Sequence, residues 1–414
     1  MSEELDLREP LDGFLHNIQA LNEATPHWML VAARNWKKSL EVHNEFLEEN
    51  GEVVEENDGL VKYKLHFRHI RKSQRLSRKS DRSQVAFDLL PRTILVSFVS
   101  EYDAFLGKLI AELIRFKPEV LNAKEKNISF SDLVDLGSVE AAREELISRE
   151  VESVLRKSHS DQFDWFEKTF NIPLRKGLDS WGSFIELTER RNLFVHCDGV
   201  VSDQYLTICD RHGVKFKERP EVGDVLECDA DYLRRAYEIL YEISVKLVQV
   251  LWRKFQPESL EKAEQSLMEV TYELLVEEKY RIAKRLLDFA CEVLKKWHSD
   301  GDRRIHVINR ALAYKFSGGE DKATKILDSE DWSACGDNFQ VCLRVLKDDF
   351  EGAREVMLRI GSDGAVQEEY YMEWPVFKNF RESEQFDQAF NEVFGYSPQA
   401  TREIGSSDGE SDGQ

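Results

Sequence analysis

The chain has 414 residues, of which 42% are hydrophobic and 33% charged, and its formal net charge at pH 7 is −21. At about 150 residues per domain, this length allows two or three domains, and the composition is that of a soluble, helix-rich globular protein. The negative charge argues against a protein that coats nucleic acid by bulk attraction. The six cysteines include no CxxC pair, which argues against a structural zinc site or a disulfide framework and indicates a reducing compartment.

The start of the chain and its hydropathy pattern predict a protein outside the membrane. The first six residues are acidic where a secretory signal peptide would be basic and then apolar. The most apolar run, residues 93–114, is interrupted by four charged side chains. We therefore expect no membrane partner and a cytoplasmic location.

Residues 1–90 form an N-terminal extension in this interpretation. Hydrophobic periodicity predicts helices around residues 14–20 and 29–47. The alternating residues 61–67, after the turn sequence Asn57-Asp58-Gly59, predict a β-hairpin.

The charge changes sign inside this extension. Residues 1–60 hold four basic against fourteen acidic side chains, whereas residues 61–92 hold ten against two. The basic segment either grips the phosphate backbone of RNA or is a solvated loop that pairs with the acidic segment. The cations expected to contact RNA are Arg68, Arg71, Lys72, Arg75, Arg78 and Lys79.

A helical core is expected at residues 91–256. Periodicity predicts its helices at residues 87–116, 138–158, 180–196 and 232–255. Asp229 or Asp231 would cap the last of them. Residues 205–209 and 214–217, on either side of Arg211-His212-Gly213, predict a second β-hairpin whose tip contacts substrate.

The segment Arg190-Arg191-Asn192-Leu193-Phe194-Val195-His196 ends the predicted helix 180–196. At 3.6 residues per turn, Asn192 lies roughly 40° and Arg191 roughly 140° from His196 around the axis, and a long arginine side chain partly closes the larger gap. A guanidinium, an amide and an imidazole can therefore line one cleft. The non-functional alternative is a His196 that interacts with the negative end of the helix dipole, beside solvated arginines.

The pattern Arg-Asn-x-x-x-His resembles the Arg-x(4–6)-His signature of the HEPN superfamily, a helical group rich in RNA-cleaving toxins and defence nucleases. Residues 94–106 look like the first long helix of that family, and residues 197–201 look like the exit from its motif helix. Where one branch of the family carries tyrosine, this chain has Asp198. The resemblance covers about residues 90–255 and implies a helical bundle, metal-independent RNA cleavage and a homodimer.

These residue types suit transesterification at an RNA phosphodiester, in which the 2′-hydroxyl attacks its own 3′-phosphate and expels the next 5′-oxygen. An imidazole with a pKa near 6.5 exchanges protons at neutral pH, so His196 is the expected acid–base group. Arg191 is expected to stabilise charge on the phosphate, and Asn192 to orient the phosphate or the His196 ring. Arg190 is a further expected RNA contact, and the chemistry needs no metal or cofactor.

One motif supplies one histidine, whereas this chemistry runs best with a separate acid and base. A second copy of the motif across a two-fold axis would supply the other group. We therefore expect a homodimer through the HEPN-like domain, with both copies of Arg191 and His196 facing a shared cleft.

Residues 257–395 change to a pattern of antiparallel helix pairs. Small residues recur after a turn at Ala283, Ala323, Ala353 and Ala389, at intervals of 40, 30 and 36 residues. The intervals bracket the period of about 34 residues of tetratricopeptide (TPR) repeats, which this region resembles as a degenerate array. Such arrays offer a concave face, so the resemblance implies a protein or peptide regulator.

The chain as a whole is expected to be mostly α: a HEPN-like helical bundle with small β-hairpin insertions, then a TPR-like α-solenoid, and a disordered tail at residues 396–414. We expect a metal-independent endoribonuclease of toxin or abortive-infection (anti-phage) type, regulated through its repeats. Two alternatives stay open. One is a non-catalytic dimeric scaffold whose repeats recruit a partner. The other is a module that binds a phosphorylated ligand in the Arg191/His196 cleft without cleaving it.

Overall fold

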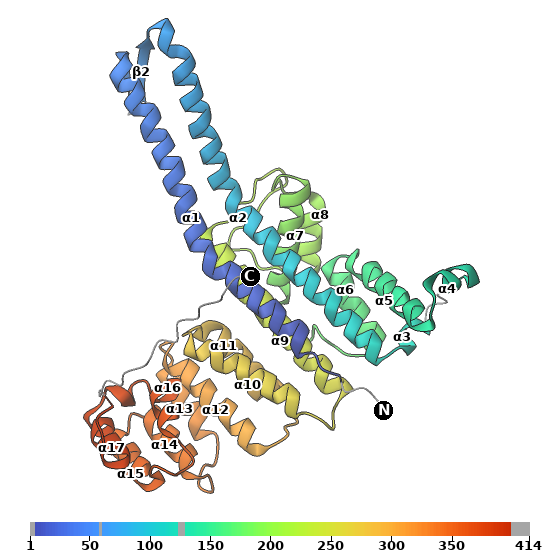
Figure 1. Cartoon of the computed structure of the whole chain (residues 1–414), viewed down its shortest axis with the longest axis vertical. Helices are drawn as coiled ribbons and strands as arrows, with labels where there is room; N and C mark the ends of the chain where they lie inside the picture. The colour runs from blue at the N-terminus through green and yellow to red at the C-terminus, as the bar shows by residue number, and fades with distance from the viewer. Residues whose placement is uncertain (1–4, 58–59, 123–128, 399–414) are drawn as a thin grey trace, which may run out of the picture. The chain divides into compact units, whose positions relative to one another are not determined.

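The computed structural model describes residues 5–57, 60–122 and 129–398, which are mostly helical (Figure 1). The chain divides into two compact units, Met1–Pro257 and Glu258–Gln414. Among the described helices, none is long and apolar enough to cross a membrane. Most of the tail expected at residues 396–414 lies outside the described residues.

The first unit runs from α1 to α9. Its elements are α1 (Arg8–Asn50), β1 (Gly51–Asn57), β2 (Leu60–Leu65), α2 (Phe67–Phe116), α3 (Glu119–Asn122), α4 (Phe130–Leu136), α5 (Val139–Leu155), α6 (His159–Phe170), α7 (Trp181–His196), α8 (Asp203–Arg211) and α9 (Ala230–Phe255). Helix α2 continues through residue 90, where we expected a domain boundary. The N-terminal extension and the helical core are therefore joined by one uninterrupted helix.

Helix α1 replaces the two helices expected around residues 14–20 and 29–47. It continues through Pro26, which lacks the N–H that an interior helical position donates. Thr25 is buried, and its hydroxyl donates to the carbonyl of Leu21 at 2.7 Å. Because α1 packs along α2, tertiary contact overrides the local break.

The far halves of α1 and α2, together with the hairpin β1–β2, project from the other helices of this unit and are called the arm below (Figure 1). Trp36 of α1 stacks on Phe87 of α2 with ring centroids 5.5 Å apart. Nε2 of His43 lies 3.3 Å from Oγ of Ser73. These pairs fix an antiparallel register along a seam of small and aromatic residues.

The first expected hairpin is confirmed, and the second is wrong. β1 and β2 pair antiparallel with Gly51 opposite Leu65, although Asp58 and Gly59 of the expected turn lie outside the described residues. Residues 205–209 belong instead to helix α8. Tyr205 and Cys209, one helical turn apart, are both buried, whereas Thr207 between them is exposed; a strand would place all three on one face.

The core of the first unit lies where α2 and α9 meet the near half of α1. Phe14 of α1 stacks on Phe105 of α2 with centroids 5.0 Å apart, and the indole N–H of Trp252 donates to the carbonyl of Leu5 at 3.0 Å. Asp229, one of the two expected candidates, caps α9 by accepting from the N–H of Tyr232 at 2.6 Å. Each large side chain buried here contributes about 1.5–3 kcal/mol relative to an exposed one.

The second unit is a succession of short helices. Its elements are α10 (Glu261–Val276), α11 (Tyr280–Asp288), the π-helix η1 (Phe289–Val293), α12 (Asp300–Lys315), α13 (Glu320–Asp328), α14 (Asp337–Leu346), α15 (Phe350–Ile360), α16 (Glu368–Glu373), the 3-10 turns η2 (Pro375–Phe377) and η3 (Phe380–Glu382), and α17 (Glu384–Phe394). The four recurring alanines are all buried and lie in α11, α13, α15 and α17. Their small side chains allow these helices to pack closely on their neighbours.

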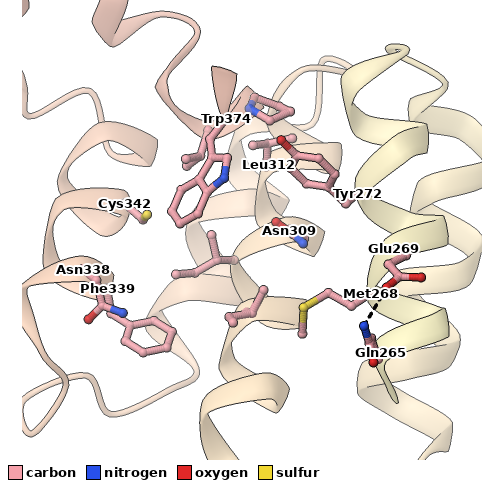
Figure 2. Close-up of a pocket in the computed structure, with 14 residues that line it drawn as sticks. Gln265, Met268, Glu269, Tyr272, Asn309, Leu312, Asn338, Phe339, Cys342 and Trp374 are labelled. Atoms are coloured by element: carbon pink, nitrogen blue, oxygen red, sulfur yellow. Dashed lines mark hydrogen bonds between the residues drawn. The ribbon is translucent and has the colours of Figure 1, made fainter. Parts of the chain in front are cut away.

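An apolar cavity of about 440 Å³ lies within the second unit. Helices α10, α12 and α14 and the segment from Trp374 to Val376 line it, and Figure 2 shows Tyr272, Leu312, Phe339 and Trp374 around it. Preformed apolar cavities of this size are typical ligand sites.

Replacing Ser80 with leucine should loosen the arm. Ser80 is buried although it lies in the projecting half of α2, so its small side chain faces α1. A leucine would overpack the seam at a cost of about 1–3 kcal/mol. Amide hydrogen exchange should become faster along the arm and stay unchanged in α9. The exposed Gln84→Leu is the matched control, and equal exchange in the two variants would contradict this packing.

Candidate functional site

Helix α7 holds the motif in place by burying its opposite face. Phe184, Ile185 and Leu187 are at most 1% exposed. At the end of the helix, the N–H groups of Cys197 and Gly199 both donate to the carbonyl of Leu193, at 2.8 and 3.0 Å. This cap fixes the last turn, which carries His196.

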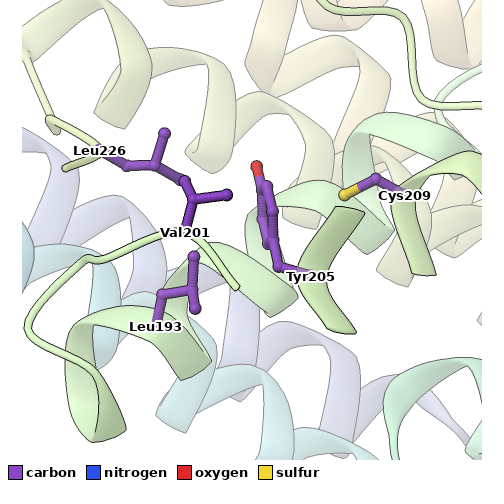
Figure 3. Packing of buried hydrophobic residues seen from close by; sticks show 5 residues of the cluster. All are labelled: Leu193, Val201, Tyr205, Cys209 and Leu226. Carbon is purple, nitrogen blue, oxygen red and sulfur yellow. The ribbon is translucent and has the colours of Figure 1, made fainter. Parts of the chain in front are cut away.

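Gly199 is required by the exit from α7. Its φ is +83°, in the left-handed region, and a Cβ there would lie 3.1 Å from the ring of Phe194. The chain then folds back, and Leu193, Val201, Tyr205, Cys209 and Leu226 form a buried cluster (Figure 3). This cluster ties α8 and the loop before α9 to the end of α7.

A cavity of about 460 Å³ opens beside α7. Arg191, Asn192 and His196, the three residues expected to be catalytic, all line it. The cavity also receives further charged or ionisable side chains, namely Asp103, Arg156, Lys157, His159 and Glu189. The motif therefore lies in a polar cavity and not on a flat, solvated helix face.

Asp103 of α2 joins two of the lining side chains. Its Oδ2 accepts from Nη2 of Arg191 at 3.0 Å, and its Oδ1 lies 2.9 Å from Nε2 of His159. A carboxylate only accepts hydrogen bonds, so Nε2 of His159 carries the proton and donates it. His159 is 5% exposed and packs edge-on against Phe184, with centroids 5.7 Å apart. Asp103 thus fixes the orientation of both the guanidinium and the imidazole.

Arg191 has a hydrogen-bond donor without a partner. Its Nε is buried and has no hydrogen-bond partner among the described residues. A buried donor without a partner costs about 1–3 kcal/mol, which an acceptor entering the cavity would remove. A phosphate oxygen is such an acceptor, and guanidinium groups bind phosphate through two parallel hydrogen bonds.

Glu189 and Asn192 form a pair within the same cavity. The amide of Asn192 donates to the carboxylate of Glu189, and Arg191 and His159 are close enough to stabilise its charge. Burial nevertheless outweighs these effects and raises the pKa of Glu189 above its ordinary value. Asn192 thus contacts Glu189 directly, a partner that the sequence did not indicate.

Arg190 lies apart from this network. Its Nε donates to Glu186 at 2.7 Å, and its guanidinium lies over the ring of Tyr232, 4.2 Å from the centroid. The hydroxyls of Tyr232 and Tyr205 also donate to Glu186, at 2.7 and 2.8 Å. Arg190, which we expected to contact RNA, is therefore engaged in a largely buried internal cluster.

The six other cations expected to contact RNA lie on the arm, all exposed on α2. Arg68 donates from Nε to His69 at 2.8 Å, and Nζ of Lys72 lies 4.7 Å from the ring centroid of Phe46. The segment is a helix, not the loop considered as an alternative. It packs beside the acidic α1, but with its charged side chains directed to solvent.

Asp103, His159 and Glu189 are site residues that sequence reasoning missed. Asp103 lies in residues 94–106, which resemble the first HEPN helix, but the sequence marks it only as a charge that interrupts an apolar run. Glu189 lies two positions before Arg191 in the sequence, but no pattern marked it as a site residue. His159 begins a different helix, α6, and had no local signal. Among the described residues, no group of three or more His, Cys, Asp or Glu side chains is placed to hold a metal ion.

Changing Glu189 to glutamine should flatten the dependence of stability on pH. Because the folded-state pKa of Glu189 is raised, the unfolded chain ionises first as pH rises, so the contribution of this side chain to stability falls as the pH is raised from about 4 toward about 8. Glutamine keeps an acceptor for Asn192 and cannot ionise. Urea unfolding at both pH values should therefore show a smaller loss in Glu189→Gln, whereas the exposed Glu218→Gln should behave as wild type. An unchanged pH dependence in Glu189→Gln would refute the raised pKa.

Comparisons of the chain with protein-family models, with curated proteins and with solved structures give no match. The residues that line the cavity beside α7 therefore carry the functional assignment by themselves.

Proposed function

We propose that this protein is a metal-independent endoribonuclease of the HEPN type, which cleaves RNA by attack of the 2′-hydroxyl on the adjacent phosphate. The observation that carries the proposal is the shared cavity of Arg191, Asn192 and His196, in which Asp103 orients the guanidinium. A solvated pair of surface residues would have neither the cavity nor the anchor.

The side chains divide the chemistry as follows. Arg191 binds the scissile phosphate and stabilises the charge that develops on its oxygens. An imidazole removes the 2′-hydroxyl proton as the O–P bond forms, and a protonated imidazole supplies a proton to the 5′-oxygen as the P–O bond breaks. His196 is exposed at the cavity and takes one of these roles. The products end in a 2′,3′-cyclic phosphate and a 5′-hydroxyl.

A local positive charge draws RNA to a protein whose net charge is −21. Arg156 and Lys157 line the cavity in addition to Arg191. The cations on the arm add a second positive surface. Attraction of the phosphate backbone is therefore confined to these places, which suits a nuclease that does not coat nucleic acid.

The second catalytic imidazole comes from a two-fold partner in the homodimer that we propose. Both copies of Arg191 and His196 would then face one cleft. His159 is a second imidazole in the same cavity of one chain, but its Nε2 is engaged by Asp103 and its ring is nearly buried. We therefore assign His159 to positioning and the second proton-transfer role to the partner's motif.

The helical repeats of the second unit are proposed to be a TPR-like solenoid that binds a protein or peptide regulator. The apolar cavity beside Trp374 and Tyr272 supports this role, because it offers a preformed site for a bulky side chain. A nuclease that cuts RNA of its own cytoplasm needs such control. We propose a toxin-type or abortive-infection role for the enzyme on this basis.

A second candidate function uses the same cavity without cleavage. The unpartnered Nε of Arg191 indicates an anionic ligand, and a bound phosphorylated small molecule would satisfy it as well as RNA does. Thermal stabilisation by a mononucleotide, without strand scission under any condition, would favour this ligand-binding module. If the protein kept its cellular function after loss of Arg191 and His196, the non-catalytic dimeric scaffold would be favoured instead.

Purified wild type should cleave RNA in the presence of EDTA and leave matched DNA intact, because the nucleophile is the 2′-hydroxyl. His196→Ala should lower the rate by about 10²–10⁴-fold and Arg191→Ala by about 10²–10³-fold. The exposed His27→Ala is the matched control and should retain full activity. Products with 5′-phosphate ends, or activity abolished by the chelator, would rule this mechanism out.

Mixing wild type with His196→Ala tests the shared cleft. When one part of wild type is unfolded and refolded with three parts of His196→Ala, about three quarters of the wild-type chains should enter heterodimers, which hold one His196 in place of two. These heterodimers lack the second proton-transfer group, so cleavage should fall to about a quarter of that of the same amount of wild type refolded alone. Cleavage equal to that of wild type refolded alone would show that each chain works alone.

A further inference from the structure

Seven cations form one continuous surface on α2, called the basic stripe below: Arg68, Arg71, Lys72, Arg75, Arg78, Lys79 and Arg82. Their spacing of three or four residues keeps them within roughly 120° around the helix axis. At about 1.5 Å per residue the basic stripe is roughly 21 Å long. All seven side chains are exposed.

Most cations of the basic stripe have no acidic partner among the described residues. Arg71, Arg75, Arg78, Lys79 and Arg82 form no ion pair with any residue that the structure describes. This holds although α1, which packs against α2, carries many carboxylates in its exposed second half, such as Glu41, Glu45, Glu48 and Glu49. The acidic residues therefore do not neutralise the basic stripe, and they repel an anion from the α1 side of the arm.

The basic stripe and the cavity belong to the same helix. The basic stripe runs along α2 from Arg68 to Arg82, and Asp103, which anchors Arg191, lies further along the same helix. From Arg82 and from Arg68 to Asp103 the axis extends by about six and ten helical turns, or roughly 30 and 50 Å. Arg78 projects within roughly 20° of Asp103 on an ideal helix, so the basic stripe and the cavity open toward similar directions.

Arg92, midway along α2, lies between the basic stripe and the cavity. It precedes Asp103 by about three helical turns, which places both on one side of an ideal helix. Nη1 of Arg92 donates to the carbonyl and to Oδ1 of Asp198, at 3.2 Å each, directly after the motif helix. This contact joins α2 to the exit of α7, the helix that carries His196.

We infer that α2 is a molecular ruler, and that the substrate is an RNA with a double-helical stem that extends from the phosphate to be cleaved as far as the basic stripe. This inference rests on the proposed ribonuclease function. At roughly 3 Å per base pair, the stem must contain on the order of 10–17 base pairs to cover the axial distance along α2. Shorter RNA would occupy the cavity without the second contact.

The chemistry of the basic stripe favours a duplex over a single strand. Proteins that bind single strands stack bases on aromatic side chains, and residues 68–82 contain no Phe, Tyr or Trp. The basic stripe offers only cations, which contact phosphates and leave bases unread. A rigid row of cations can contact phosphates along the outside of a stem, whose axis is straight and whose bases are paired and hidden.

Binding by full-length His196→Ala, which cannot transfer the proton, separates this inference from cleavage. Fluorescence anisotropy is measured with labelled RNAs that carry the same single-stranded end and stems of about 6, 12, 18 and 24 base pairs. We expect affinity to rise at least about tenfold between the shortest stem and the 18-base-pair stem and then to level off. Adding Arg71→Glu, Arg75→Glu and Arg78→Glu should abolish this rise and reduce the salt slope by about 2–3.

The matched control makes the same charge change on the other helix of the arm. Arg34→Glu, Lys37→Glu and Lys38→Glu alter three exposed cations of α1 and should leave affinity and its length dependence unchanged. Affinity independent of stem length, an equal effect of the two triple variants, or equal affinity for single strands of the same length would overturn the inference. The inference would also be overturned if the triple variant of α2 lost binding to phosphatidylserine vesicles but kept its binding to RNA. Length-dependent binding by a wild type that cuts no RNA would instead refute only the proposed function.

Discussion

The cavity depends on the two hydrogen bonds that the carboxylate of Asp103 accepts. This carboxylate joins three helices, because it comes from α2 and holds Arg191 of α7 and His159 of α6, at 3.0 and 2.9 Å. Hydrogen bonds to charged groups are stronger than those between neutral groups, so these two bonds hold the three helices together at the cavity. Without Asp103, Arg191 would keep a buried Nε and lose the carboxylate that anchors it in the cavity.

Adjacent positions of α7 receive different roles from the helical geometry. Arg190 and Arg191 project about 100° apart, so one guanidinium is held by Glu186 in the interior and the other enters the cavity. Glu186, which pairs with Arg190, also accepts from the hydroxyls of Tyr205 in α8 and Tyr232 in α9, and these bonds fix α7 against both helices. The motif is therefore a positioned part of the fold, and its exposed end at His196 remains open to a ligand.

Sequence reasoning predicted the elements whose signals are local. The motif helix, the cap of α9 by Asp229 and the hairpin before α2 follow from periodicity and turn residues within a few positions. Helix α8 was mistaken for a strand because Tyr205 and Cys209 bury one face with few residues between them. The length of α2 was underestimated because its arm packs through serines such as Ser73 and Ser80, which carry no apolar period.

The site itself was predictable only in part. Arg191, Asn192 and His196 could be grouped from their spacing on one helix. Asp103 and His159 come from helices much earlier in the chain, and only the packing of α2 and α6 on α7 brings them to the cavity. The ionic partners of the basic segment were also undecidable from sequence, because charge counts do not say whether side chains of neighbouring helices point toward each other.

A crystal structure of the protein with an RNA stem–loop whose 2′-hydroxyls are methylated tests the central claim most directly, because the nucleophile is blocked and the complex persists. The proposal predicts a backbone phosphate in the cavity beside α7, at about 3 Å from the guanidinium of Arg191 and within reach of the His196 ring. An RNA bound elsewhere on the protein, with the Arg191 guanidinium and the His196 ring free of phosphate, would contradict it.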